Sequence, residues 1–149
     1  MTRYLLDTSV LVPLLLDYGE KLLNIASKTT IYTLDLTIYE AGNSLWKLVT
    51  YLNTIDLKDA ENIMHVLKDL TKKEVVKTIR FNQLNPCKIL ELAANEKTTF
   101  YDASYIVASK ITEATLVTED KELREKAGKH VNTATYTQFK QKVKQKVKT

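Results

Sequence analysis

Short runs of apolar and β-branched residues recur along the chain, separated by longer stretches in which apolar residues return every three or four positions. Runs of four or five such residues, bounded by polar or turn-forming residues, are typical of buried strands. We therefore predict strands at residues 3–7, 30–34, 75–79 and 115–118, with a short fifth strand at 131–135.

The stretches between these runs have the periodicity of amphipathic helices. Residues 8–28 predict two short helices broken near Asp17-Tyr18-Gly19. Longer helices are predicted at residues 38–52, 57–70, 86–97, 102–113 and 120–128, the last ending at Gly128. Strands that alternate with helices indicate an α/β fold, with a central, mostly parallel sheet of four to five strands and helices on both faces.

The composition is that of one ordered globular domain. The chain has 149 residues, of which 44% are hydrophobic, with only three Gly and two Pro. A chain of this length can bury a substantial core without disulfides or metal staples. The single Cys87 and the absence of a secretory or membrane-spanning segment predict a cytoplasmic protein with no membrane association.

Positive charge is concentrated at the C-terminus. The net charge is +4, and five lysines lie in residues 136–149, so the rest of the chain has a net charge of −1. We therefore divide the chain into a domain at 1–135 and a basic C-terminal tail at 136–149. In a helix, Tyr136, Phe139, Val143 and Val147 would form one apolar stripe. The tail is then either a solvated helix docked by this stripe or a contact for RNA or an acidic partner.

Four acidic residues follow or adjoin the predicted element boundaries: Asp7, Glu40, Asp102 and Asp120. Asp7 ends the first strand, Glu40 and Asp102 open helices, and Asp120 follows the strand at 115–118. If the strands are parallel, all four carboxylates gather at the edge where α/β sheets bind ligands. Converging carboxylates indicate a hard divalent cation such as Mg²⁺.

Each carboxylate also has a local explanation. Thr37-x-x-Glu40 and Thr99-x-x-Asp102 have the form of capping boxes, and Asp7 and Asp120 lie where acidic side chains stabilise the start of a helix. Four caps, however, need not meet at one sheet edge. Zinc is not indicated, because His65, His130 and Cys87 lack ligand spacing.

Four segments carry a resemblance to a known family: residues 5–9 (LLDTS), 39–43 (YEAGN), 101–105 (YDASY) and 116–123 (LVTEDKEL). In this order they resemble the successive motifs of PIN-domain nucleases, in particular the VapC-type toxins of prokaryotic toxin-antitoxin modules. The resemblance runs from the first strand to about Gly128. One departure is the turn Thr112-Glu113-Ala114, where relatives often have glycine.

The resemblance implies a Rossmann-like PIN domain that cleaves single-stranded RNA endonucleolytically with Mg²⁺ or Mn²⁺. By position, Asp7, Glu40, Asp102 and Asp120 correspond to the catalytic and metal-binding acids, with Ser9, Asn43 and Thr118 in support. Asp7 and Asp102 are our direct-ligand candidates. Asp120 would complete the site or hold a second ion, and Glu40 would act through water.

The resemblance also implies a small antitoxin protein as partner. Apolar groups outside the main helix stripes, namely Tyr39, Trp46 and Tyr51, predict a twofold homodimer. Two alternatives to a toxin stay open: a housekeeping RNA-processing nuclease, and a non-catalytic RNA-binding or scaffold protein that keeps the fold.

Overall fold

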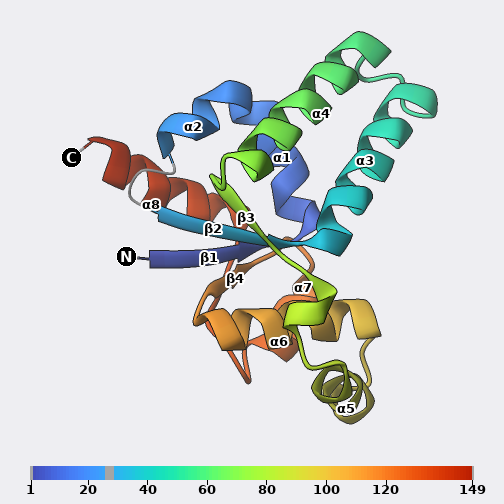
Figure 1. Cartoon of the computed structure of the whole chain (residues 1–149), viewed down its shortest axis with the longest axis vertical. Helices are drawn as coiled ribbons and strands as arrows, with labels where there is room; N and C mark the ends of the chain where they lie inside the picture. Colours follow the sequence, from blue (N-terminus) through green and yellow to red (C-terminus); the bar gives the residue numbers. More distant parts are fainter. Residues whose placement is uncertain (1, 26–28, 149) are drawn as a thin grey trace.

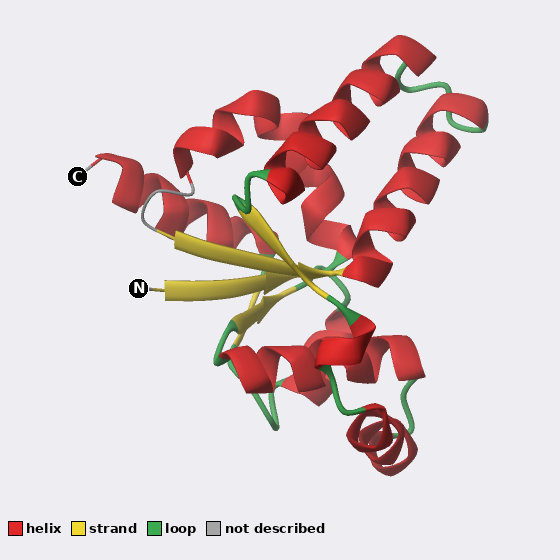
Figure 2. Ribbon diagram, in the orientation of Figure 1, coloured by secondary structure: helices red, strands yellow, loops and turns green. Residues whose placement is uncertain are grey.

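The computed structural model describes residues 2–25 and 29–148, with side chains in the last helix described to residue 144. The strands are β1 (Thr2–Leu6), β2 (Thr29–Leu34), β3 (Val76–Ile79), β4 (Thr115–Val117) and β5 (Thr133–Ala134). They form one sheet in the order β3-β2-β1-β4-β5, and every neighbouring pair is parallel. The predicted α/β architecture is confirmed (Figure 2).

Helices cover both faces of this sheet (Figure 1). On one side lie α1 (Thr8–Tyr18), α2 (Leu22–Ile25), α3 (Asp35–Thr50), α4 (Leu57–Lys72) and α8 (Tyr136–Lys148). On the other side lie α5 (Pro86–Glu96), α6 (Phe100–Thr112) and α7 (Lys121–Ala127). Alternate strand residues point to opposite faces. Leu6 therefore joins the α1 side of the core, whereas Leu5 packs against α6 and α7.

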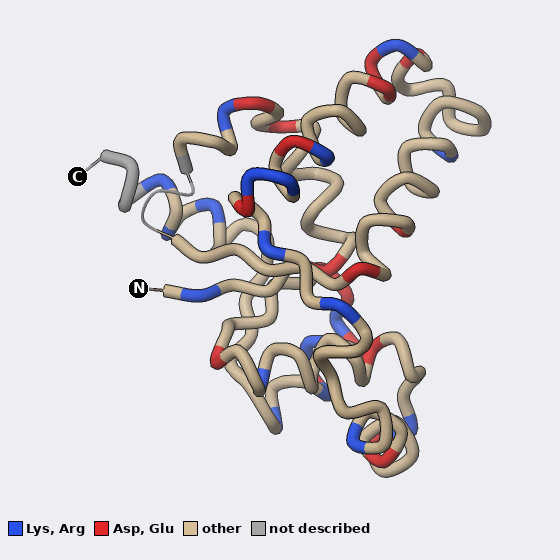
Figure 3. The backbone as a smooth tube through the Cα atoms, viewed as in Figure 1, with Lys and Arg blue, Asp and Glu red and all other residues tan. Residues whose placement is uncertain are grey.

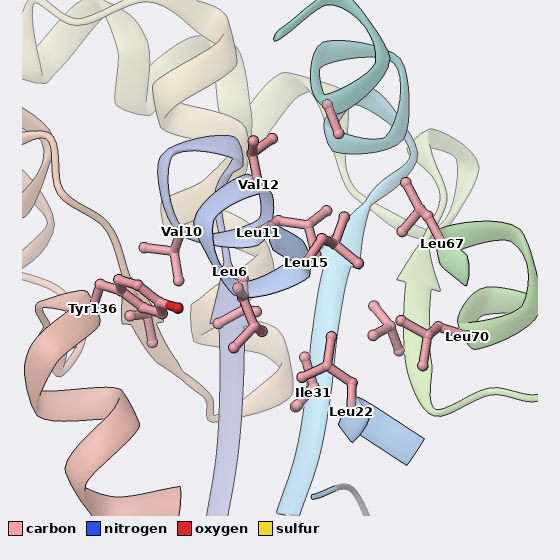
Figure 4. Packing of buried hydrophobic residues seen from close by; sticks show 14 of the residues in the cluster. Leu6, Val10, Leu11, Val12, Leu15, Leu22, Ile31, Leu67, Leu70 and Tyr136 are labelled. Atoms are coloured by element: carbon pink, nitrogen blue, oxygen red, sulfur yellow. The ribbon is translucent and has the colours of Figure 1, made fainter. Parts of the chain in front are cut away.

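The larger core is built around α1, in which Val10, Leu11, Val12, Leu14 and Leu15 are buried (Figure 4). Pro13 lies within this helix without ending it. The break predicted near residues 17–19 occurs at Gly19, which has a φ of 51° and therefore needs the conformational freedom of glycine. A 3₁₀ turn at Gly19–Lys21 leads into α2, and residues 26–28 of the predicted region lie outside the described residues.

Helix α3 begins three residues earlier than predicted, at Asp35. The hydroxyl of Thr37 accepts a hydrogen bond from the backbone N–H of Leu34 at 3.2 Å, which stabilises the first turn from inside the helix. The predicted capping box Thr37-x-x-Glu40 is therefore wrong. Glu40 lies in the second turn of α3, and its carboxylate is available for other contacts.

The basic tail is helical, as predicted, and its first half belongs to the core. Tyr136, Phe139 and Val143 are buried on the α1 side of the sheet, and the Phe139 ring packs edge-on against Tyr4 at 4.9 Å. Lys140, Lys142 and Lys144 lie along the helix between these apolar positions (Figure 3).

Candidate active site

The strand order creates one reversal point. After β3 the chain returns across the sheet, so that β4 pairs with the other side of β1. Ligand sites in open α/β sheets form beside the carboxyl ends of the strands at such a reversal. Asp7 follows β1 there, and Thr118 and Asp120 follow β4. Acidic segments of the chain gather at this end of the sheet (Figure 3).

Asp7 is only 7% exposed, and its carboxylate accepts hydrogen bonds from two hydroxyl groups. The Ser9 hydroxyl donates to Oδ1 at 2.5 Å, and the Thr118 hydroxyl donates to Oδ2. Each hydroxyl in turn accepts from a backbone N–H: Ser9 from Glu119 at 2.9 Å, and Thr118 from Asp120 at 3.0 Å. Because a hydroxyl has one proton to donate, these backbone bonds direct both protons to Asp7.

Asp120 and Asp102 lie at the starts of two helices on the other side of the sheet. Asp120 is the N-cap of α7, and its Oδ1 accepts from the backbone N–H of Leu123 at 3.1 Å. In α6 the cap is Thr99, which accepts from the backbone N–H of Asp102 at 3.1 Å. The side chain of Asp120 therefore caps its helix. The carboxylate of Asp102 instead accepts a hydrogen bond from the Thr98 hydroxyl at 3.5 Å.

Glu40 is tied to the same region by two donors. The hydroxyls of Thr8 and Tyr105 each donate to its Oε1 at 3.1 Å. The Tyr105 hydroxyl also lies 2.7 Å from the Thr37 hydroxyl. Burial, together with the charge of Glu40, raises the pKa of Tyr105 far above its usual range. Tyr105 therefore remains protonated and connects α6 to α3. Sequence reasoning did not identify Thr8 or Tyr105, although both lie within the recognised motifs.

The electrostatics of the site favour partial neutralisation of its acids. Burial raises the pKa of Asp7, the two hydroxyl donors lower it, and the negative charge of Asp120 raises it. Burial likewise raises the pKa of Asp102, and Asp120 raises it further. Asp120 thus interacts with both other aspartates. A cation at this point would relieve the repulsion among them.

The donor set fits a hard cation, but the side chains as they stand do not form a closed ligand cage. Among residues 2–25 and 29–148, no three His, Cys, Asp or Glu side chains converge on one point. Asp120 nevertheless interacts through charge with both Asp7 and Asp102. Oxygen donors of this kind suit Mg²⁺ or Mn²⁺ and not a softer metal.

Asn43 lies on α3 three residues after Glu40, and both line a groove between α1 and α3. The two histidines lie elsewhere. His65 is on the exposed surface of α4, and His130 pairs with Glu96 at 3.0 Å. Within the described part of the chain, no helix combines the length and apolar character needed to cross a membrane.

Comparison with known proteins decides the family. The model of the PIN domain family matches residues 4–129, a span that contains all four carboxylates. The chain belongs to the PIN domain family. The resemblance to VapC-type PIN-domain nucleases is therefore confirmed.

Two relatives support this assignment. This PIN domain is 35% identical over 121 residues to a protein named Exonuclease VapC9 from Pyrobaculum aerophilum. The aligned region covers 81% of this chain and 83% of that protein. It is also similar to the crystal structure of PAE2754 from Pyrobaculum aerophilum. The TM-score is 0.71 at 30% identity, over 95% of this chain and 89% of the other.

Proposed function

We propose that this PIN domain is a Mg²⁺- or Mn²⁺-dependent endonuclease of single-stranded RNA and the toxin of a VapBC-type pair. The observation that carries the proposal is the buried Asp7 carboxylate, oriented by Ser9 and Thr118 at the reversal point of the sheet and influenced by the charge of Asp120. A purely capping role does not explain Asp7, whose side chain forms no cap hydrogen bond.

Asp7, Glu40, Asp102 and Asp120 are the residues that would hold the metal. A bound divalent cation supplies positive charge, which stabilises the phosphate oxygens as a P–O bond breaks. Ser9 and Thr118 fix the orientation of Asp7. Thr8 and Tyr105 bind Oε1 of Glu40, and we assign Oε2 to the attacking water. Hydrolysis adds this water to phosphorus, transfers one of its protons to a carboxylate and leaves the departing ribose oxygen protonated by solvent.

The main alternative is exonucleolytic cleavage, which the name of the 35% identical relative favours. Circular RNA separates the two activities because it has no end for an exonuclease. We expect the protein to open single-stranded circular RNA in Mg²⁺ or Mn²⁺ and to lose this activity in excess chelator. Cleavage of linear RNA from one end, with circular RNA intact, would instead support the exonuclease.

Substitutions test the residues. Asp7→Asn and Asp102→Asn should each abolish most cleavage and reduce the thermal stabilisation by metal, which is about 2.7 kcal/mol at one hundred times the dissociation constant. Glu91→Gln, at an exposed position of α5, is the control and should behave as the parent protein. Metal-dependent cleavage retained in both aspartate variants would refute the assignment.

Growth of an expressing cell tests the toxin assignment against a housekeeping or scaffold role. Induction of the parent protein should arrest growth, co-expression of a small antitoxin encoded beside it should relieve the arrest, and Asp7→Asn should be harmless. An RNA-processing enzyme would leave growth unchanged. A non-catalytic binding protein would be equally toxic with and without Asp7.

A further inference from the structure

The groove between α1 and α3 is continuous with the candidate active site. It has a volume of about 790 Å³, and its lining includes Ser9, which donates to Asp7, and Glu40 itself. A molecule that fills the groove therefore reaches the carboxylates. The groove extends from there along α3 as far as Leu52, away from the sheet.

One stripe of α3 runs along this groove. Tyr39, Asn43 and Lys47 follow at intervals of four residues, which places them on the same face of the helix. Tyr39 and Lys47 are separated by a rise of about 12 Å. The stripe therefore presents an aromatic ring beside Glu40, an amide in the middle and a cation at the far end.

Tyr39 is unusually exposed for a large aromatic residue. Its side chain is 83% exposed, the highest value among the large hydrophobic residues described, and it directly precedes Glu40. An exposed aromatic ring beside a site that cleaves a nucleic acid offers a flat surface on which a base can stack. Stacking of this kind accepts any base, because every base has a π-face.

Lys47 supplies the complementary charge. It is exposed, and it makes no ion pair with a carboxylate in the described residues. Its position in the last turn of α3 is favourable for a cation, and the ammonium group is available to a phosphate. Between the two ends, the Asn43 amide can donate to and accept from a base edge or a ribose hydroxyl.

We propose that the groove between α1 and α3 is a subsite for the strand next to the scissile phosphate, in which a base stacks on Tyr39 and a further phosphate binds Lys47. The proposal rests on the proposed function and extends it, because it says which surface selects single-stranded RNA. A base that is already paired is stacked within its duplex, so Tyr39 is accessible only to an unpaired base.

Binding measured without metal tests the subsite independently of catalysis. The probe is a fluorescent single-stranded RNA of about ten nucleotides, within the range of single-strand site sizes, in the presence of EDTA. Tyr39→Ala should weaken binding about tenfold, and Tyr39→Trp should restore it. Lys47→Gln should reduce the slope of log affinity against log salt by about 0.7, the value for one phosphate contact on a single strand.

Matched controls lie outside the groove, one just beyond the end of α3 and the other on α4. Tyr51→Ala removes a tyrosine that is 67% exposed beyond the end of α3, and Lys58→Gln removes an exposed lysine of α4. Both should bind RNA as the parent protein does. Hydrolysis of bis(p-nitrophenyl) phosphate with Mn²⁺, measured beside RNA cleavage, should likewise be unchanged in these two control variants.

The outcomes separate the two proposals. Parent protein that binds RNA through Tyr39 and Lys47 but hydrolyses neither RNA nor the small diester would refute the proposed function and keep the subsite. Active parent protein with unchanged RNA affinity in Tyr39→Ala and Lys47→Gln would refute the subsite, and would leave the groove to a protein partner. A change of oligomeric state in Tyr39→Ala would also refute it, since the ring would then belong to a subunit contact.

Discussion

Asp7 combines two opposing demands. Burial disfavours its charge and raises its pKa, whereas the hydroxyls of Ser9 and Thr118 donate to the charged form. The first effect is the larger. The carboxylate is therefore oriented before any ligand binds, and a cation bound beside it would stabilise its charged form.

The raised pKa of Asp7 predicts a pH-dependent difference in stability. Folded Asp7 keeps its proton to higher pH than unfolded Asp7, whose pKa is about 3.9. Its contribution to the free energy of unfolding is therefore complete below about pH 4 and is lost as the pH rises through the folded-state pKa. Metal-free Asp7→Asn lacks this loss. We expect the stability of the variant relative to the parent, measured by urea unfolding in EDTA, to increase from pH 4 to pH 7; a constant or declining difference would contradict the assigned pKa direction.

At the residue scale, sequence reasoning found the acids and their two hydroxyl partners but not Thr8 and Tyr105. Motif positions identify carboxylates directly, because few other side chains suit a hard cation. The contact between Tyr105 and Glu40 joins residues 65 positions apart in the sequence. It depends on the packing of α6 against the sheet, and spacing within either motif alone does not specify it.

At the scale of elements, most helix ends followed the sequence, and the start of α3 did not. Asp56 and Thr99 cap α4 and α6 with side-chain hydrogen bonds, as their residue types suggest. Leu34 at the start of α3 has no side chain able to cap. Thr37 compensates from inside the first turn, which a pattern of N-cap residues does not predict.

The turn after α6 contains the departure from the family resemblance noted at Thr112-Glu113-Ala114. Glu113 has a φ of 54° and a ψ of 38°, a left-handed conformation that costs a side-chain-bearing residue about 1–2 kcal/mol. Its ion pair with Arg3 at 3.8 Å is exposed and contributes little. We expect Glu113→Gly to increase the free energy of unfolding by about 0.5–1 kcal/mol, after the entropy cost of glycine, and to raise the melting temperature by about 1–4 °C. Glu113→Gln, which keeps the strained conformation, should leave the melting temperature unchanged.

Helix α8 contributes to stability through its apolar stripe. Phe139 is 1% exposed and contacts Tyr4 edge-on. We expect Phe139→Ala to lower the free energy of unfolding by about 3–5 kcal/mol, measured by urea denaturation. A loss below about 1 kcal/mol would mean that α8 is detached from the core in solution.

The charge of the α8 lysines can be tested separately from the apolar stripe of the helix. Deleting residues 136–149 would remove the buried stripe together with the charge, so substitution is the cleaner experiment. Lys142 and Lys144 are exposed. We expect the double variant Lys142→Gln/Lys144→Gln to bind single-stranded RNA more weakly, with a salt slope lower by about 1.4, and to melt with the parent protein. Unchanged RNA affinity at low salt would assign these lysines to solubility or to antitoxin binding.

At the scale of the whole molecule, the exposed aromatic surface of α3 still predicts a homodimer. Trp46 is 48% exposed and contacts Tyr51 edge-on at 5.1 Å, a small apolar patch of the kind that a twofold axis can bury. Light scattering should give twice the mass of the chain, and Trp46→Glu should shift the protein towards monomer. Leu90→Glu, at a position of α5 that is 62% exposed, should not. A monomer at every accessible concentration would contradict the prediction.

The sheet itself was the most predictable feature, because five short apolar runs that alternate with amphipathic helices admit few other arrangements. Its strand order was not read from the sequence. That order depends on which side of β1 receives β4 after the long return from β3. Local periodicity carries no information about such a choice, because it shows only that alternate residues of β4 face opposite cores, as Leu116 and Val117 do.

The strand order also means that neither part of the chain contains the candidate active site alone. The segment through β3 carries Asp7 and Glu40 and supplies β1 and β2, whereas the segment after it carries Asp102 and Asp120 and supplies β4. The exposed 3₁₀ turn at Phe81–Gln83 lies between them. If these four residues form the active site, we expect a chain divided at this turn to give two inactive fragments, with nucleolytic activity returning only where they meet, as a split reporter of proximity requires.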